Sequence, residues 1–226
     1  ANVSHELRTP LTTIKSYVEA LDDGALEEPE LAKRFVGVIR GESNRMIRLV
    51  NDLLHLSRLD SNQERLRPIE VNVREMLEEV SDRFSFQMKQ KGIGGSVLIE
   101  DGIETAWFDR DQIDQVLDNL MSNAIKYTQD GGHIEISARK PTPDTVSISV
   151  KDNGMGIPEK DQARIFERFY RVDKARSRNM GGTGLGLSIA REIIKAHGGT
   201  IELESELNRG TTVTFTLPLR QGGDAG

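Results

Sequence analysis

The sequence contains no cysteine, which excludes disulfide-stapled folds, cysteine-ligated zinc, iron–sulfur clusters and thiol nucleophiles. It also has no excess of basic charge, since 30 Lys and Arg stand against 36 Asp and Glu, a net charge of −6. Proteins that hold nucleic acid by bulk charge are usually basic, so we expect no nucleic-acid partner. The apolar runs are far shorter than the roughly 20 residues of a membrane-spanning helix, so we expect no membrane contact by this chain.

What remains is the composition of a folded protein. Hydrophobic residues make up 36% and charged residues 29% of the 226 positions, which allows a sizeable core and argues against disorder. The length suits one or two domains of roughly 150 residues. The chain shows no signal-peptide pattern and opens at Ala1 without an initiator methionine, so we interpret it as a fragment of a longer protein.

Residues 1–60 carry the periodicity of two long amphipathic helices. Apolar residues recur every three or four positions over 3–21 and again over 31–59, the spacing of one helix face. The turn Asp22-Asp23-Gly24 separates the two stretches. Because a lone helical hairpin cannot cover both of its apolar faces, we expect a second copy to complete a four-helix bundle.

The rest of the chain mixes helices and strands. The sequence predicts helices over Val73–Gln90, Asp109–Tyr127 and Ser188–His197, and strands over Ser96–Glu100, Ala106–Phe108, His133–Arg139, Thr145–Lys151, Thr200–Ser205 and Thr211–Leu217. Helices with a largely antiparallel sheet predict an α/β sandwich of two layers. We therefore expect an α+β chain with a helical domain at 1–62, a linker at 63–68, a second domain at 69–220 and a disordered tail at 221–226.

The first candidate for chemistry is the segment around His5. Neutral imidazole is a nucleophile at physiological pH, and a neighbouring carboxylate can fix its tautomer; Glu6 is placed to do so, and Thr9 lies one turn further along. An isolated His-Glu pair is more often a solvated helix face, so this segment alone is a weak signal. It lacks the second histidine of a His-Glu-x-x-His zinc site.

A second candidate is the polar stripe Asn119, Asn123 and Lys126. These residues fall at i, i+4 and i+7, hence on one helix face, and amide oxygens with an ammonium suit a Mg²⁺–phosphate group. An ordinary exposed face is the alternative. Asparagine is a poor helix former, which favours a functional interpretation.

Two glycine-containing turns complete the set. In Asp152-Asn153-Gly154-Met155-Gly156, the glycines permit close backbone approach to a ligand and Asp152 can accept a hydrogen bond from an adenine amine; a capped strand–turn–helix connection explains it equally well locally. The loop Gly181–Leu187 opens onto a helix and offers backbone N–H groups to an anion. It lacks the Gly-Lys-Ser/Thr of a Walker A loop. Ser177–Met180 before it predict a mobile lid.

Aromatic and basic residues lie between these turns. Phe166 and Phe169 are most simply core anchors. Tyr170 and Arg171 can reach phosphate oxygens, and arginine commonly stabilises developing phosphoryl charge. Surface pairing with acids explains Arg171 equally well.

Taken together, these segments resemble the sensor histidine kinases of two-component systems over about residues 1–219. Ser4–Pro10 resembles their H box, Asn119–Tyr127 the N box, Asp152–Gly156 the G1 box, Phe166–Phe169 the F box and Gly182–Leu187 the G2 box. Each motif alone is weak to moderate, but five in order are highly specific. Phe169–Arg176 and Glu42–Met46 are most similar to the WalK subfamily of low-GC Gram-positive bacteria.

The resemblance implies a dimeric histidine-phosphotransfer hairpin followed by a Bergerat-type ATP-binding domain. His5 would be the phosphoacceptor, Glu6 its base or orienting carboxylate, and Thr9 the residue that positions water to dephosphorylate the response regulator. Asn123, supported by Asn119, would hold Mg²⁺. The resemblance places the nucleotide against Lys126, Tyr127, Asp152, Gly154, Gly156, Tyr170, Arg171, Gly182, Thr183, Gly184, Leu185, Gly186, Leu187 and, through water, Thr211.

The same resemblance implies autophosphorylation with ATP, relay to an aspartate of a receiver domain, and phosphatase activity. It places the fragment in the cytoplasm and the full-length protein in the bacterial membrane. Two alternatives remain: another Bergerat ATPase of the chaperone, mismatch-repair or topoisomerase type, which the His-bearing hairpin argues against, and a non-catalytic dimeric scaffold, which the intact nucleotide motifs argue against.

Overall fold

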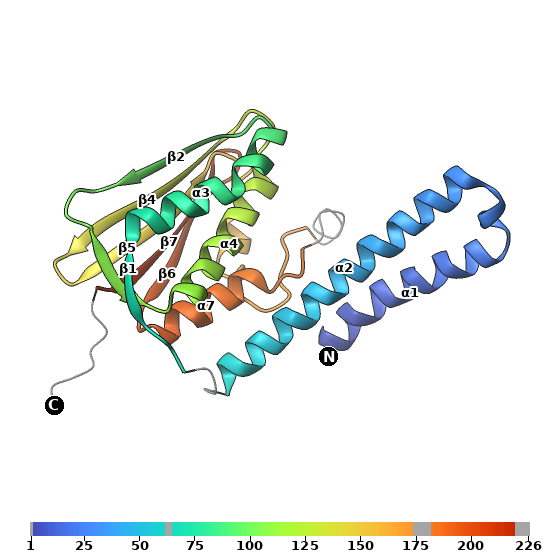
Figure 1. The fold of residues 1–226 in the computed structure, drawn as a ribbon, viewed down its shortest axis with the longest axis horizontal. Helices are drawn as coiled ribbons and strands as arrows, with labels where there is room; N and C mark the ends of the chain where they lie inside the picture. The colour runs from blue at the N-terminus through green and yellow to red at the C-terminus, as the bar shows by residue number, and fades with distance from the viewer. Residues whose placement is uncertain (1, 62–64, 174–181, 220–226) are drawn as a thin grey trace.

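The computed structural model describes residues 2–61, 65–173 and 182–219, and in it the chain begins with a helical hairpin. Helices α1 (Asn2–Asp22) and α2 (Pro29–Asp60) run side by side, joined by a short 3₁₀ turn, η1 (Ala25–Glu27). Figure 1 shows the hairpin extending away from the rest of the molecule, with its turn at the far end. The turn is possible because Gly24 takes a φ of 118°, which a residue with a side chain rarely adopts.

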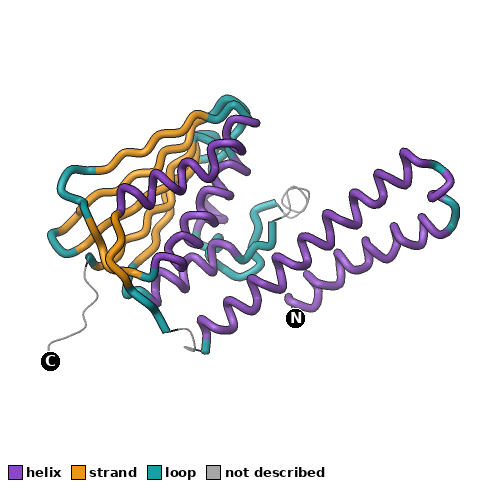
Figure 2. Tube along the Cα trace, viewed as in Figure 1, coloured by secondary structure: helices purple, strands orange, loops and turns teal. Residues whose placement is uncertain are grey.

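The remainder forms a sheet with helices on one face, as Figure 2 shows. Its helices are α3 (Val73–Gln90), α4 (Arg110–Tyr127), the short α5 (Glu159–Gln162) and α7 (Gly186–Ala196). Its strands are β1 (Ile69–Asn72), β2 (Gly94–Ile99), β3 (Thr105–Phe108), β4 (His133–Thr142), β5 (Thr145–Asp152), β6 (Thr200–Glu206) and β7 (Gly210–Pro218). The main sheet has the order β2-β4-β5-β7-β6, and β1 pairs with β3 in a separate ribbon.

The helices begin where the sequence supplies side-chain caps. Asn72 Oδ1 accepts the Glu75 N–H at the start of α3, and Asp109 Oδ1 accepts the Gln112 N–H at the start of α4. These bonds satisfy N–H groups that have no partner within the helix. The caps therefore mark where both helices start, while their buried apolar residues determine which faces meet the sheet.

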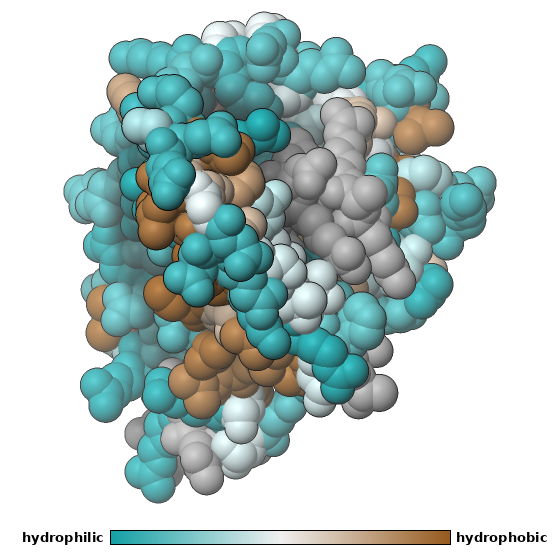
Figure 3. All heavy atoms as spheres, turned by 90° about the vertical axis from the view of Figure 1, so that its right-hand side faces the viewer, coloured by the Kyte–Doolittle hydropathy of each residue, from teal (hydrophilic) through white to brown (hydrophobic). Residues whose placement is uncertain are grey.

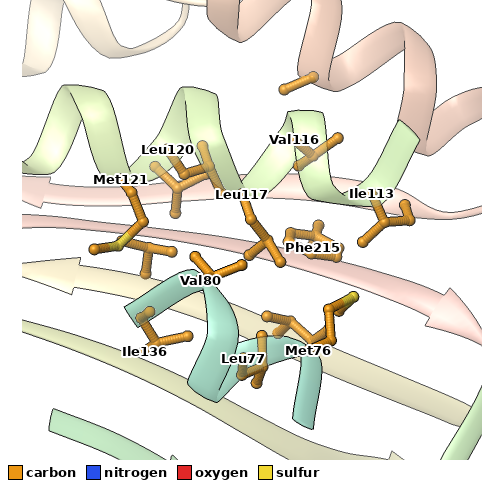
Figure 4. Packing of buried hydrophobic residues seen from close by; sticks show 14 of the residues in the cluster. Met76, Leu77, Val80, Ile113, Val116, Leu117, Leu120, Met121, Ile136 and Phe215 are labelled. Carbon is orange, nitrogen blue, oxygen red and sulfur yellow. The ribbon is translucent and has the colours of Figure 1, made fainter. Parts of the chain in front are cut away.

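The core lies between that sheet and helices α3, α4 and α7. Figure 4 shows Leu77 and Val80 of α3 and Leu117 of α4 packed with Ile136 and Phe215 of the sheet. Each of these five side chains is at most 2% exposed. Burying such a side chain stabilises the fold by about 1.5–3 kcal/mol, so this layer holds the sheet and the helices as one unit.

The predicted α+β class, a helical hairpin ahead of an α/β unit, is confirmed. The sequence did not predict the ribbon strand β1 or the short helices η1 and α5. Nor did it predict that β2 pairs with β4 in parallel, whereas the remaining pairs of the main sheet are antiparallel. The predicted tail at 221–226 and the predicted lid at 177–180 lie outside the described residues.

Helix α1 continues through Pro10. Proline has no backbone N–H, so the Glu6 carbonyl lacks the i+4 donor that a helix normally provides. Thr9 Oγ1 and Thr13 Oγ1 donate to the carbonyls of His5 and Thr9 in the same stretch. Among residues 2–61, 65–173 and 182–219, no helix combines the length and the apolar character needed to cross a bilayer.

The hairpin packs against the sheet unit through α2, which lies beside α7 (Figure 1). Leu49 and Leu56 of α2 are each 2% exposed and belong to the same hydrophobic cluster as the sheet core. Arg168 donates to Asp60 near the end of α2, with 2.7 Å between Nη2 and Oδ1. The hairpin is therefore docked on the side of the molecule where α7 begins.

Candidate nucleotide and phosphoacceptor sites

A cavity of about 730 Å³ lies between α4, the turn after β5, the start of α7 and the middle of α2. Fourteen of the residues singled out from the sequence line it: Asn119, Asn123, Lys126, Tyr127, Asp152, Gly156, Tyr170, Arg171, Gly182, Thr183, Gly184, Gly186, Leu187 and Thr211. Three separate sequence motifs therefore meet around one cavity, whose size is in the range of small-molecule sites.

One end of the cavity combines a buried carboxylate with apolar walls. Asp152, 9% exposed, ends β5, and its Oδ1 accepts the Gly154 N–H at 2.9 Å. Burial raises the pKa of Asp152, while backbone hydrogen bonds from Gly154 and Thr211 act in the opposite direction. Val150 and Val213 line the cavity beside it. A flat apolar surface with one fixed acceptor suits a purine base that carries an exocyclic amine.

The turn that follows Asp152 depends on glycine. Gly156 has a φ of 66°, and a Cβ added there would lie 2.0 Å from the Glu206 carbonyl oxygen. A larger residue would therefore collide with the end of β6. Gly154 does not line the cavity; it serves the site through its hydrogen bond to Asp152.

The other end of the cavity is formed by the glycine loop, here defined as residues 182–186, and by the first turn of α7. Gly184 adopts a φ of 76°, and its carbonyl accepts the Phe169 N–H at 2.8 Å. Leu185, the residue at the N-cap of α7, provides no side-chain cap for the N–H groups at the start of this helix. Such a helix start favours anions through its free N–H groups and its dipole. Leu185 is fully buried, so its side chain belongs to the core rather than to the cavity.

Helix α4 supplies the polar wall of the cavity. Asn119 Nδ2 donates to the Gly186 carbonyl at 3.2 Å, which ties α4 to the start of α7. Asn123 lines the cavity one turn later. The Lys126 ammonium lies 5.0 Å from the centre of the Tyr127 ring, a cation–π contact. The described residues contain no group of three or more His, Cys, Asp or Glu side chains that could hold a metal ion on their own.

The segment Phe169–Arg171 contacts the glycine loop. Phe169 has a φ of 65°, a strained conformation for a residue other than glycine and one that concentrates at functional sites. The Tyr170 hydroxyl donates to Asp161 Oδ1 at 2.6 Å, so in this structure it is engaged with α5. Arg171 Nη2 donates to the Thr183 carbonyl at 2.8 Å.

The predicted phosphoacceptor lies on the hairpin. His5 is exposed and shares a second cavity with Arg8, Thr9 and Tyr17, among others. It does not line the nucleotide cavity. Thr9 Oγ1 donates to the His5 carbonyl at 3.2 Å.

Glu6, next in the chain, turns towards the nucleotide cavity. Its Oε2 accepts from Arg171 Nη2 at 2.8 Å and from Arg45 Nη2 at 3.3 Å. Both arginine side chains are 5% exposed. The hydrogen bond from the His5 Nδ1–H to the Glu6 carboxylate stays a prediction.

Sequence reasoning missed two hairpin residues at this cavity. Arg48 and Asp52 of α2 both line it, and Thr183 Oγ1 donates to Asp52 Oδ2 at 2.8 Å. Their spacing of four places them on one helix face, but the sequence does not reveal which side of the hairpin meets the second unit. The complete cavity can hold a purine at one end and an anion at the other.

Comparisons with known proteins agree with this geometry. Residues 108–221 match the family described as histidine kinase-, DNA gyrase B- and HSP90-like ATPase, and residues 1–62 match the His Kinase A (phospho-acceptor) domain. The chain is 49% identical over 222 residues to the sensor histidine kinase WalK of Bacillus subtilis, covering 98% of this chain and 36% of that protein. It thus spans about a third of that relative's length.

Solved structures of histidine kinases share the fold. The Acinetobacter baumannii kinase AdeS has a TM-score of 0.75 and 27% identity, over 96% of this chain and 98% of that one. The kinase ThkA, in complex with the response regulator protein TrrA, has a TM-score of 0.81 and 30% identity, over 99% of this chain and 62% of that one. A catalytic domain of ThkA alone is 34% identical with a TM-score of 0.60, over 68% of this chain and 98% of that one.

Proposed function

Because this chain belongs to the sensor histidine kinases, with WalK-like relatives, we propose that it transfers the γ-phosphoryl group of ATP to His5. The observation that carries the proposal is that the buried Asp152 and the start of α7 line one cavity. The unit that contains this cavity packs against the hairpin that bears His5. A new N–P bond forms at the imidazole, the bond between the γ-phosphorus and the bridging oxygen breaks, and ADP leaves.

The residues around the cavity divide the work. Asp152 accepts a hydrogen bond from the adenine amine. Lys126 and Tyr127 contact the phosphates and the nucleotide. Gly154, Gly156 and the segment Gly182–Leu187 shape the loops around the ligand. Arg171 and Tyr170 face the phosphates when the nucleotide is bound. Phosphoryl transfer needs mainly positioning and charge neutralisation, which these side chains and backbone groups provide.

We assign the Mg²⁺ site to Asn123, with Asn119 in support. Amide oxygens are hard ligands, and Mg²⁺ in nucleotide sites is completed by phosphate oxygens and water rather than by an all-protein cage. That preference fits a cavity wall with asparagine but no acidic cluster among the described residues. When bound, the ion neutralises phosphate charge and aligns the leaving group.

Since His5 does not line the cavity here, transfer within one chain requires the two units to move relative to each other, whereas transfer between two copies would use the His5 of the second chain. The linker at 63–68 is the connection between the two units, and the domains are those at 1–62 and 69–220. Hinge motion at such a linker is a natural point of control for a sensor lying upstream in a longer protein. We place this fragment on the cytoplasmic side of a membrane-anchored kinase.

Phosphorylated His5 is then the donor to an aspartate of a response-regulator receiver domain, with Glu6 orienting the imidazole. In the separate phosphatase reaction, Thr9 positions the water that attacks the aspartyl phosphate of the receiver domain, and inorganic phosphate leaves. A phosphoramidate is a reactive donor that an incoming carboxylate can attack, so relay follows from the chemistry of the His5 adduct.

A second copy of the chain completes the hairpin. Its exposed apolar residues form stripes on both helices: Val3, Leu11 and Val18 on α1, and Ile47, Val50 and Leu54 on α2. Figure 3, which faces the hairpin side, shows apolar atoms gathered on an otherwise hydrophilic surface. Burying them would remove apolar area from water. Leu54→Glu should convert a dimer to a monomer in sedimentation analysis, whereas Leu98→Glu on β2, 53% exposed, should leave it dimeric.

The decisive experiment incubates the protein with Mg²⁺ and γ-labelled ATP beside His5→Gln. We expect acid-labile label on the unaltered protein, none on the variant, and equal ATP binding by both. Acid-stable label, or label that survives His5→Gln, would refute His5 as the acceptor. Release of phosphate without protein label would instead identify an ATP hydrolase.

A further inference from the structure

The hairpin contacts the glycine loop through the side chain of Asp52 on α2. Thr183 Oγ1 donates to Asp52 Oδ2 at 2.8 Å, and the same hydroxyl oxygen accepts the Leu185 N–H at 3.3 Å. Thr183 is therefore held between a carboxylate of α2 and the backbone immediately before α7. All of this lies at the end of the cavity that offers N–H groups to an anion.

An aspartate is an unexpected residue in a phosphate site, because its charge repels the ligand. Asp52 is partly buried, and burial raises its pKa, while Arg48 and His55 nearby act in the opposite direction. Charge alone would disfavour a carboxylate here. Asp52 instead supplies a hydrogen-bond acceptor at a fixed position on a long helix. A loop that is already held in the shape it has in the complex binds its ligand more tightly.

We propose that Asp52 is a positioning residue of the nucleotide site, which holds the glycine loop through Thr183 so that the site is complete only when the hairpin is docked. This inference rests on the proposed function, since the ligand it concerns is ATP. Its consequence is that nucleotide affinity and hairpin docking are linked: each favours the other by the same factor.

The test separates the hydrogen bond of Asp52 from its charge. Asp52→Asn removes the charge but retains an acceptor for Thr183, whereas Asp52→Ala removes both. We expect AMPPNP with Mg²⁺, titrated by calorimetry, to bind Asp52→Asn at least as tightly as the unaltered chain. Asp52→Ala should bind about three- to tenfold more weakly than Asp52→Asn, the effect of one hydrogen bond.

The partner residue gives an independent comparison. Thr183→Ser retains the hydroxyl and should keep its affinity, whereas Thr183→Val should lose at least as much as Asp52→Ala, because it also removes the acceptor of the Leu185 N–H. Combining Asp52→Ala with Thr183→Val should lose no more than Thr183→Val alone, because the bond to Asp52 is already absent in that variant. Glu30→Ala, at an exposed position near the start of α2, is the control and should change nothing.

The outcomes distinguish this inference from the function on which it rests. Suppose that the unaltered chain binds AMPPNP, but that Asp52→Ala binds it as tightly as Asp52→Asn, or that the affinity losses of Asp52→Ala and Thr183→Val add in the double variant. Asp52 then has no positioning role, and the kinase assignment stands. If the unaltered chain binds no nucleotide, both the positioning role of Asp52 and the kinase assignment are refuted. The melting temperature without nucleotide should be similar for Asp52→Ala and Asp52→Asn, since a general folding defect would lower it together with affinity.

Discussion

Arg171 donates a hydrogen bond to Glu6 across the boundary between the sheet unit and the hairpin, with 2.8 Å between Nη2 and Oε2. Arg45 of α2 shares the same carboxylate oxygen. One carboxylate thus faces two guanidinium groups that are almost wholly buried. Buried charges need such partners, because an uncompensated one is strongly destabilising.

Glu6→Gln should therefore lower the free energy of unfolding by about 1–3 kcal/mol, since the amide removes the negative charge that the two buried guanidinium groups share. Arg45 keeps its ion pair with Glu42, 3.6 Å between Nη1 and Oε2. Urea denaturation at neutral pH measures this difference. Glu30→Gln, which removes a similar charge from an exposed position, serves as the matched control. Equal losses in the two variants would show that the Arg45–Glu6–Arg171 cluster contributes nothing specific.

Thr9→Ala should spare autophosphorylation and weaken the phosphatase reaction on a phosphorylated receiver domain. The hydroxyl donates to the His5 carbonyl within α1, and a helix tolerates alanine better than threonine, so the helix itself should persist. Rates of label gain on His5 and of label loss from the receiver domain measure the two activities. A parallel decline in both would contradict the water-positioning role.

Asp152→Asn should weaken ATP binding at least about tenfold. The amide substitution removes a charged hydrogen-bond acceptor inside the cavity, and hydrogen bonds to charged groups contribute about 1.5–3 kcal/mol. Equilibrium titration with ATP measures the change, and Asp130→Asn, in the exposed loop after α4, is the control. An unchanged dissociation constant would remove Asp152 from the adenine site.

His197 should make stability depend on pH. Its Nε2 accepts the Asp109 N–H at 3.1 Å, its Nδ1 bonds the Ile193 carbonyl, and burial lowers its pKa. Because the folded state then binds fewer protons than the unfolded state, whose histidine titrates near 6.5, the free energy of unfolding should fall as the pH drops below about 6.5.

The comparison variant is His197→Gln, in which this titration is absent. Urea denaturation at a series of pH values should show a steeper acid decline for the unaltered chain than for the variant, since His5, His55 and His133 are common to both. The variant should also be less stable at pH 7.5, by about 1–3 kcal/mol, where it leaves the Asp109 N–H poorly paired. Identical slopes would mean that His197 titrates as it does in the unfolded chain.

Local sequence patterns were sufficient to predict much of the fold of this molecule. The three- and four-residue spacing marked both hairpin helices, and the motifs around Asp152 and Thr183 were recognisable because glycine and aspartate have backbone roles that few other residues fill. The strand Ile69–Asn72 was missed because α3 begins at the next residue, Val73, so no turn separates the strand from the helix.

The contacts between the two units could not be predicted in the same way. Asp52 and Arg48 occupy ordinary polar positions of an amphipathic helix, and only the docked arrangement brings them to the nucleotide cavity. Leu185 illustrates the reverse case: it lies within a glycine motif, yet its side chain is fully buried. Motif membership therefore indicates where a backbone runs but not which side chains reach a ligand.

The proline at position 10 has a consequence for the turn that carries His5. Because Pro10 offers no donor to the Glu6 carbonyl, this turn is joined to the rest of α1 by one backbone hydrogen bond fewer than its neighbours. Local opening there should need about 1 kcal/mol less than in the following turn. The imidazole thus lies on a turn that can rearrange with one backbone hydrogen bond fewer to break, so it can meet two different reaction partners in turn while the remainder of α1 stays folded.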